Sequence, residues 1–226
     1  MNYDDKVIAS WIDHTLLKPD ANEEAIEKLC FEAITYKFRT VCVNGKWVSL
    51  CNEVLKSSET GIAVVVGFPL GANHTPVKAF EAAVAASGGA TEIDMVLSIG
   101  QLLEGNHKAV EADIREVVNA VNGQAIVKVI LETGFLNDEQ KVTACKLSEA
   151  AGAHFVKTST GFGPGGATAE DIRLMRGAVS SHVQVKASGG IRDLETAILM
   201  VEAGATRLGT SSGIAIIRGL KSESSY

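Results

Sequence analysis

The sequence lacks the features of a membrane protein, a secreted protein or a nucleic-acid-binding protein. No apolar run approaches the roughly 18 residues that a membrane span needs. Residues 1–5 are acidic and polar, unlike a secretion signal. The formal net charge of −6 gives no general attraction for nucleic acid or acidic membranes. A phosphate group would therefore have to be bound by local donors.

Cysteine and histidine are scarce, and neither shows a spacing typical of disulfide bonds or of a metal site. The cysteines (Cys30, Cys42, Cys51 and Cys145) are not spaced in pairs, so we expect reduced thiols in a soluble, cytoplasmic protein. The histidines are too scattered to suggest a zinc site.

Apolar segments alternate with helical patterns along the whole chain. The predicted strands are 12–17, 40–43, 61–66, 91–97, 125–131, 153–157, 183–187 and 206–209. The predicted helices are 22–36, 46–55, 75–86, 107–121, 137–150, 168–179 and 193–203, with a short helix from 211. This order predicts an α/β fold, a (β/α)₈ TIM barrel. An open doubly wound sheet is the competing fold, but no Gly-x-Gly-x-x-Gly lies between the first strand and helix.

No linker or low-complexity segment divides the chain. We therefore expect a single domain over residues 1–226, with residues 220–226 as a flexible C-terminal tail.

Lys157 stands at the end of a predicted core strand, where a lysine is rarely buried without compensation. One explanation is a lysine whose amine reaches water from the strand end. The other is a desolvated amine of lowered pKa that attacks a carbonyl to form a Schiff base.

The alternation of side chains along strands favours the second explanation. The aliphatic phase of each strand must pack on the outer helices, so the polar phase points into the barrel. That phase carries Asp13, Asp94, Lys128, Lys157 and Lys186, with Cys42 and Asn44 nearby. A purely structural set of buried ion pairs would contribute little net stability. A second ammonium, Lys186, would lower the pKa of Lys157, and Asp94 could transfer protons.

Glycine-rich loops follow predicted strands six, seven and eight, at Gly161, 188–192 and 209–213. In barrels, phosphate commonly binds on backbone N–H groups of the last loops. The residues expected to bind substrate or phosphate are Asp13, Lys128, Thr158, Gly161, Gly189, Gly190, Arg192, Gly209, Ser211 and Ser212.

The segments that carry these residues closely resemble the deoxyribose-phosphate aldolase family, class I aldolases of (β/α)₈ fold. They are 13–18 (DHTLLK), 66–71 (VGFPLG), 92–96 (EIDMV), 128–133 (KVILET), 156–162 (VKTSTGF), 185–192 (VKASGGIR) and 209–213 (GTSSG). The resemblance implies reversible cleavage of 2-deoxy-D-ribose 5-phosphate to acetaldehyde and D-glyceraldehyde 3-phosphate, with neither metal nor organic cofactor. It implies Lys157 as the Schiff-base residue, Asp94 as the proton shuttle and Lys186 as the residue that depresses the pKa of Lys157. We expect a homodimer or homotetramer.

Two positions need comment beside that family. Some members have a lysine after the glycine at Gly161, where it helps bind phosphate, whereas this chain has Phe162. Backbone amides and Arg192 would then carry more of that contact. The terminal Tyr226 resembles a tail tyrosine of some members and is a candidate proton relay, although exposed tails are usually disordered.

Two other functions share parts of this pattern. A phosphate-sugar isomerase or epimerase would use the phosphate loops but has no need of paired interior lysines. A catalytically silent sugar-phosphate sensor would be stabilised by ligand without turnover.

Overall fold

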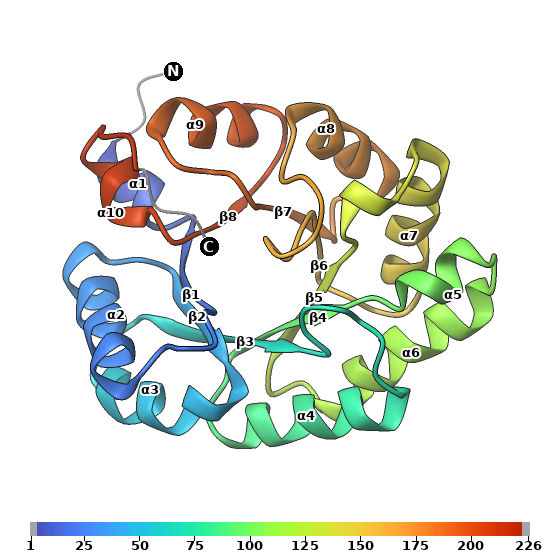
Figure 1. Ribbon diagram of the computed structural model, residues 1–226, viewed down its shortest axis with the longest axis horizontal. Helices are drawn as coiled ribbons and strands as arrows, with labels where there is room; N and C mark the ends of the chain where they lie inside the picture. Colours follow the sequence, from blue (N-terminus) through green and yellow to red (C-terminus); the bar gives the residue numbers. More distant parts are fainter. Residues whose placement is uncertain (1–3, 223–226) are drawn as a thin grey trace.

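The computed structural model describes residues 4–222 of the chain, which form a closed barrel of parallel strands surrounded by helices (Figure 1). The strands are β1 (Ile12–Leu16), β2 (Thr40–Asn44), β3 (Gly61–Val66), β4 (Glu92–Val96), β5 (Ile126–Ile130), β6 (Phe155–Lys157), β7 (Gln184–Ser188) and β8 (Arg207–Thr210). They pair in sequence order, and β8 closes on β1 with Asp13 opposite Gly209. The predicted (β/α)₈ TIM barrel is confirmed.

The helices between the strands cover the outside of the barrel. They are α2 (Glu23–Tyr36), α3 (Val48–Leu55), α4 (Thr75–Ser87), α6 (His107–Ala120), α7 (Asp138–Ala150), α8 (Ala169–Ala178), α9 (Leu194–Glu202) and α10 (Gly213–Ile217), with 3₁₀ turns η1 (Gly45–Trp47) and η2 (Thr133–Phe135). Several begin at side-chain caps that the sequence signals. Asn22 accepts from the Ala25 N–H, and Asn137 forms a capping box with Gln140.

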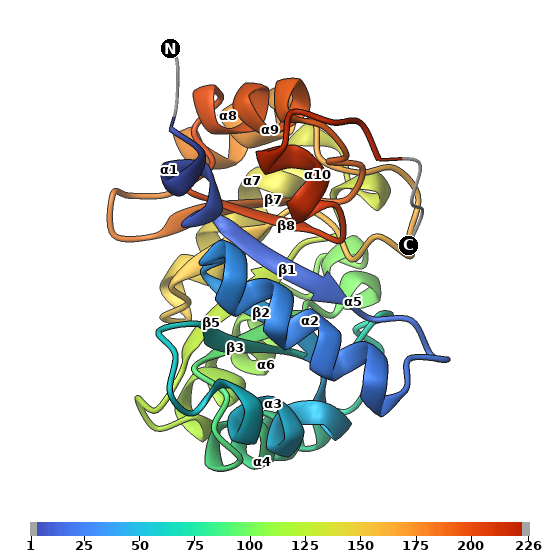
Figure 2. The same ribbon diagram turned by 90° about the vertical axis from the view of Figure 1, so that its left-hand side faces the viewer.

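Two short helices were not predicted. Helix α1 (Asp5–Ala9) precedes β1, and α5 (Ile99–Leu103) follows β4. Each is five residues long, too short to show the 3.6-residue periodicity on which a helix prediction depends. In Figure 2, α1 lies at the end of the barrel where β1 begins.

The apolar core lies between the strands and the outer helices. The residues of the aliphatic phase, such as Val127, Val129 and Val185, are fully buried in it. A second, smaller apolar cluster lies inside the barrel and comprises Leu17, Cys42, Ala63 and Val65, with Phe68 packed against it. The inside of the barrel is therefore apolar along β2, β3 and the end of β1.

The end of the described chain returns to the loop after β7. The Leu220 N–H donates to the Ala215 carbonyl, and the Ser222 N–H donates to the Arg192 carbonyl at 3.0 Å. Tyr226 lies outside the described residues. Within residues 4–222, no helix has the length and apolar character needed to cross a bilayer.

Candidate active site

Asp94 lies at the centre of an ionic cluster inside the barrel. Its Oδ2 accepts hydrogen bonds from Lys157 Nζ and Lys186 Nζ, each at 2.8 Å, and its Oδ1 accepts from Lys128 Nζ at 2.6 Å. These side chains are at most 3% exposed. Three lysines from adjacent strands β5, β6 and β7 thus converge on one carboxylate from β4, as the alternation of their strands predicts.

Asp13 joins the same cluster from β1. Its carboxylate forms ion pairs with Lys186, with Arg207 at 2.7 Å and with Lys128 at 3.6 Å. All five interior residues expected from the sequence, including Asp13, are therefore brought together.

The structure adds two residues that the sequence reasoning did not assign to the site. Arg207 Nη1 donates to both Asp13 and Glu92 at 2.7 Å, and Lys128 Nζ lies 2.5 Å from Glu92 Oε2. Glu92 precedes Asp94 by two residues on β4, so the alternation that predicts Asp94 inside the barrel applies to Glu92 as well. The signal available for Arg207 was its two-residue spacing from Gly209, which lies on the inward face of β8.

The cluster shifts the pKa of each member according to its neighbours. Burial alone would raise the pKa of Asp94, but the Lys128, Lys157 and Lys186 ammonium groups outweigh it and hold that pKa well below the usual range. Asp13 is likewise lowered, because Lys186, Lys128 and Arg207 outweigh its burial. Both carboxyl groups are therefore ionised at neutral pH.

Among the three lysines, Lys157 is distinct. Burial lowers its pKa, and the positive charge of Lys186 lowers it further, against the opposing effect of Asp94. The pKa values of Lys128 and Lys186 are raised, because Asp94 and Asp13 more than offset the effect of burial. Lys157 is thus the lysine of this cluster that loses its proton most readily, and a neutral amine is a nucleophile.

An apolar wall faces the ionic cluster from β1, β2 and β3. Cys42 lies in this wall, fully buried, and burial raises the pKa of its thiol, which is neutral at physiological pH. Phe68 continues the wall into the loop after β3 and meets Phe162 edge-on, with ring centroids 5.4 Å apart. A substrate at Lys157 would therefore have one apolar side and one charged side.

The loop after β6 is fixed to the strands on both sides. Thr158 Oγ1 donates to the Ser188 carbonyl at 2.8 Å and accepts from the Ser188 N–H at 2.9 Å. On the other side, the Glu132 carboxylate accepts hydrogen bonds from the Thr160 N–H and hydroxyl. Thr158 was expected to bind substrate, and the structure shows its hydroxyl bonded to the β7 backbone.

The expected phosphate-binding glycines divide into two groups. Gly161, Gly189 and Gly190 lie in loops with φ of 88°, 90° and 80°, a conformation that favours glycine. A Cβ added at Gly190 would meet no atom within 4 Å, so backbone there is open to a ligand. Gly209 instead lies within β8, where an added Cβ would be 2.9 Å from Lys186 Cε. Its hydrogen side chain makes room for Lys186.

The loops after β7 and β8 are joined at the same end of the barrel. Thr210 Oγ1 donates to the Ile191 carbonyl at 2.7 Å, and the Ser212 N–H donates back to Thr210 Oγ1. The Ser212 hydroxyl is buried and has no hydrogen-bond partner. Arg192 is exposed on the neighbouring loop. These groups are available donors for an anion.

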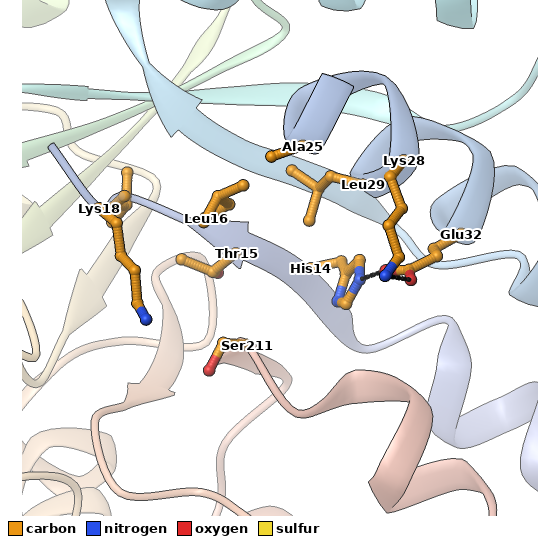
Figure 3. Close-up of a pocket in the computed structure, with 10 residues that line it drawn as sticks. His14, Thr15, Leu16, Lys18, Ala25, Lys28, Leu29, Glu32 and Ser211 are labelled. Atoms are coloured by element: carbon orange, nitrogen blue, oxygen red, sulfur yellow. Dashed lines mark hydrogen bonds and ion pairs between the residues drawn. The ribbon is translucent and has the colours of Figure 1, made fainter. Parts of the chain in front are cut away.

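A cleft of about 280 Å³ lies beside this end of the barrel, between β1, α2 and the loop after β8 (Figure 3). It is lined by Lys18 and Ser211 on one side, and by His14 and Glu32, which pair at 2.8 Å, on the other. His14 is on the outward phase of β1, so the cleft lies outside the ionic cluster. Across residues 4–222, no group of His, Cys, Asp and Glu side chains is arranged to hold a metal ion.

Comparison with known proteins places this geometry in a family. The profile of the DeoC/LacD family aldolases matches residues 7–219. A deoxyribose-phosphate aldolase of Clostridium kluyveri is 57% identical over 214 residues, covering 95% of this chain and 98% of that protein. Deoxyribose-phosphate aldolase 1 of Bacillus licheniformis is 55% identical over 221 residues, with 98% and 99% coverage.

A solved structure of a deoxyribose-phosphate aldolase has the same fold as this chain. The deoxyribose-phosphate aldolase of Aeropyrum pernix, described as having a unique tetrameric structure, superposes with a TM-score of 0.89 at 34% identity, covering 95% of this chain and 91% of that one. The sequence match and the shared barrel lead to one conclusion: the chain belongs to the DeoC/LacD family of aldolases.

Proposed function

We propose that this protein is a deoxyribose-phosphate aldolase that cleaves 2-deoxy-D-ribose 5-phosphate reversibly to acetaldehyde and D-glyceraldehyde 3-phosphate through a Schiff base on Lys157. The observation that carries the proposal is the position of Lys157: a buried amine of lowered pKa that shares Asp94 with a second lysine. The high identity to deoxyribose-phosphate aldolases supports the substrate.

The first half of the reaction forms the imine. The neutral Lys157 Nζ attacks the C1 carbonyl of the open-chain sugar, and the resulting carbinolamine loses water to give a protonated imine. A positive charge thereby returns to a nitrogen that lies 2.8 Å from Asp94 Oδ2 in the free protein. The ionised Asp94 stabilises that charge, which is how a preorganised carboxylate assists this step.

The second half breaks the carbon–carbon bond. A base removes the proton of the C3 hydroxyl, the C2–C3 bond breaks, and its electron pair forms the enamine while glyceraldehyde 3-phosphate leaves. The enamine carbon then takes up a proton, and water hydrolyses the imine to acetaldehyde and free Lys157. Asp94, acting with a water molecule, is the proposed carrier of these protons.

The substrate phosphate is assigned to the loops after β6, β7 and β8. The backbone at Gly189 and Gly190, the Ser211 and Ser212 hydroxyls and the exposed Arg192 supply donors there. Asp13 and Lys128 lie deeper, where their charges hold Lys186 and Asp94.

The proposal is tested by trapping the imine. The protein is incubated with acetaldehyde and sodium borohydride, then digested and mapped by mass spectrometry. We expect a two-carbon adduct on Lys157 that is absent from Lys157→Ala, together with turnover of deoxyribose 5-phosphate. Rapid turnover without any adduct would indicate a mechanism without an imine. Neither adduct nor turnover would favour a silent sugar-phosphate-binding barrel, detected as thermal stabilisation by ligand alone.

The proposal also covers the location of the enzyme in the cell, its cofactor requirement and its oligomeric state. We infer a cytoplasmic protein that needs no metal or organic cofactor and assembles as a homodimer or homotetramer. The four cysteines are unpaired and buried, which suits a reducing compartment. Light scattering after size exclusion measures the assembly, and activity after exhaustive dialysis against a chelator tests metal independence.

A further inference from the structure

Beneath Asp94 the barrel interior has a second ionic layer that the proposed chemistry does not use. Arg207 Nη1 bridges Asp13 Oδ1 and Glu92 Oε2 at 2.7 Å each, and its Cζ lies 5.3 Å from the centre of the Phe155 ring. The Arg207 and Glu92 side chains are each 6% exposed. A bridging arginine buried at this depth calls for an explanation beyond stability, because buried ion pairs contribute little net stability.

The whole interior cluster carries one more cation than carboxylates. The three carboxylates are Asp13, Glu92 and Asp94, and the four cations are Lys128, Lys157, Lys186 and Arg207. The other two strands contribute Cys42, whose thiol is neutral, and the apolar Ala63 and Val65. With every group charged, the cluster would bury an uncompensated positive charge, which is costly in a desolvated interior.

The loss of one proton removes that excess, and the contacts determine which group loses it. Arg207 stays charged at any physiological pH. Lys128 contacts Asp13, Glu92 and Asp94, and Lys186 contacts two carboxylates. Lys157 pairs with Asp94 alone among the described carboxylates. It has the fewest partners, so its charge is the least stabilised.

We propose that Arg207 and Glu92 are positioning residues that set the charge of the cluster, Arg207 supplying the fourth cation that leaves Lys157 as the neutral amine. This inference rests on the proposed function, because it concerns the amine that forms the Schiff base. The directions of the pKa changes agree with it: the pKa of Lys157 is lowered, whereas those of Lys128 and Lys186 are raised.

The two residues are expected to act in opposite directions. Arg207→Gln leaves three cations against three carboxylates, so Lys157 keeps its proton more firmly. The acidic limb of the pH profile, where kcat/KM rises with pH as Lys157 loses its proton, then moves to higher pH. Glu92→Gln leaves four cations against two, so the limb moves to lower pH. Each shift should be about one pH unit, the size expected for one charge at about 10 Å in a protein interior.

Two further variants separate charge from structure. The double variant Glu92→Gln/Arg207→Gln restores an excess of one cation, so its acidic limb should return close to that of the wild type. Arg207→Lys keeps the charge and should keep the limb. A purely structural role predicts instead that the double variant is worse than either single one. Asp113→Asn is the matched control, because Asp113 is a buried carboxylate paired with Lys78 between α4 and α6, outside the barrel interior.

The experiment measures the fraction of Lys157 labelled by acetaldehyde and sodium cyanoborohydride from pH 5 to 9, alongside kcat/KM for deoxyribose 5-phosphate, with folding checked by circular dichroism. Opposite shifts for the single variants and recovery in the double variant support the inference. Shifts in the same direction, or folded variants with unchanged limbs, overturn it while leaving the Schiff base intact. If Arg207→Gln does not fold, the Glu92→Gln variant decides the question: a shift of its acidic limb to lower pH supports the inference, and an unchanged or upward-shifted limb overturns it. A wild type that is never labelled overturns both proposals.

Discussion

Lys157 and Lys186 donate to the same oxygen of Asp94, each Nζ lying 2.8 Å from Oδ2. They are register partners on the adjacent strands β6 and β7, so their side chains leave the barrel wall side by side. Two charged ammonium groups on one buried oxygen repel each other, and the one with fewer carboxylate partners loses its proton more easily. Asp13 is the additional partner that keeps Lys186 charged.

Lys186→Leu should therefore raise the pKa of Lys157. The substitution removes the neighbouring positive charge and leaves Asp94 Oδ2 to Lys157 alone, so the amine stays protonated at neutral pH. We expect kcat/KM at pH 7 to fall by up to about tenfold for each unit by which that pKa rises above the working pH, because the neutral fraction of the amine falls in that proportion. The measurement is the pH dependence of Lys157 labelling and of turnover. Unchanged activity at neutral pH would remove Lys186 from the mechanism.

Gly209→Ala tests the placement of Lys186 without changing a charge. The new Cβ would lie 2.9 Å from Lys186 Cε and 3.0 Å from Ser188 Cβ, so the lysine must move. We expect a loss of about 1–3 kcal/mol in stability from overpacking, and a shift of the acidic limb to higher pH as Lys186 retreats from Lys157. Chemical denaturation and the pH profile of kcat/KM are the two measurements.

Gly100→Ala is the matched control for that substitution. Gly100 lies in α5, where an added Cβ meets no atom within 4 Å. Its pH profile should match that of the wild type, and its stability should rise by at most about 1 kcal/mol because alanine favours a helix over glycine. If the alanine at Gly209 also leaves the pH profile unchanged, the position of Lys186 does not tune Lys157.

The strand alternation in the sequence predicts most of the ionic cluster but not Arg207. In strands β4 to β7 a strict two-residue alternation separates Asp94 and Lys186 from aliphatic neighbours, and this fixes which side chains enter the barrel. Strand β8 is short and includes a glycine, so its four residues (Arg207–Thr210) show no comparable alternation and gave no phase for Arg207. Nor can a sequence show which hydroxyl groups are occupied, as that of Thr158 is by Ser188. The role expected of Tyr226 falls outside the described residues.

Phe162→Lys should strengthen binding of phosphorylated substrates. Phe162 is 45% exposed in the loop after β6. It follows Gly161, where the resemblance described above implies a phosphate-binding lysine in some members of the family. One exposed charged contact contributes about 0.2–1 kcal/mol, so we expect KM for deoxyribose 5-phosphate to fall by up to about fivefold. The kinetics of unphosphorylated deoxyribose should not change.

Phe135→Lys is the control for that gain. Phe135 lines the same apolar pocket as Phe162 and is 52% exposed, so a lysine at position 135 adds the same charge close to position 162. Equal effects of the two substitutions, both abolished by salt, would indicate long-range attraction rather than a contact with the phosphate.

Lys157→Met should stabilise the fold while abolishing the reaction. Methionine fills a similar volume and, unlike Lys157, need not give up a proton when the chain folds, so we expect a gain of about 1–2 kcal/mol at pH 7. Because the pKa of Lys157 is lower in the folded protein than in the unfolded chain, its deprotonation on folding costs less as the pH rises, so the contribution of this lysine to stability increases with pH. The gain from Lys157→Met should therefore be larger at pH 6 than near pH 10, where the unfolded lysine also approaches its pKa of about 10.4.

Lys78→Met distinguishes this effect from the simple removal of a buried lysine. Lys78 is fully buried, pairs with Asp113 at 2.7 Å and donates to the Val96 carbonyl at 3.0 Å. Its loss leaves the Asp113 carboxylate without its cation, so we expect a destabilisation of about 3–5 kcal/mol. Thermal melts of both variants at pH 6, 7 and 9.5 give the comparison. If Lys157→Met were destabilising to the same degree, Lys157 would be a fully compensated cation in the resting enzyme, and the charge imbalance could not be the source of its reactivity.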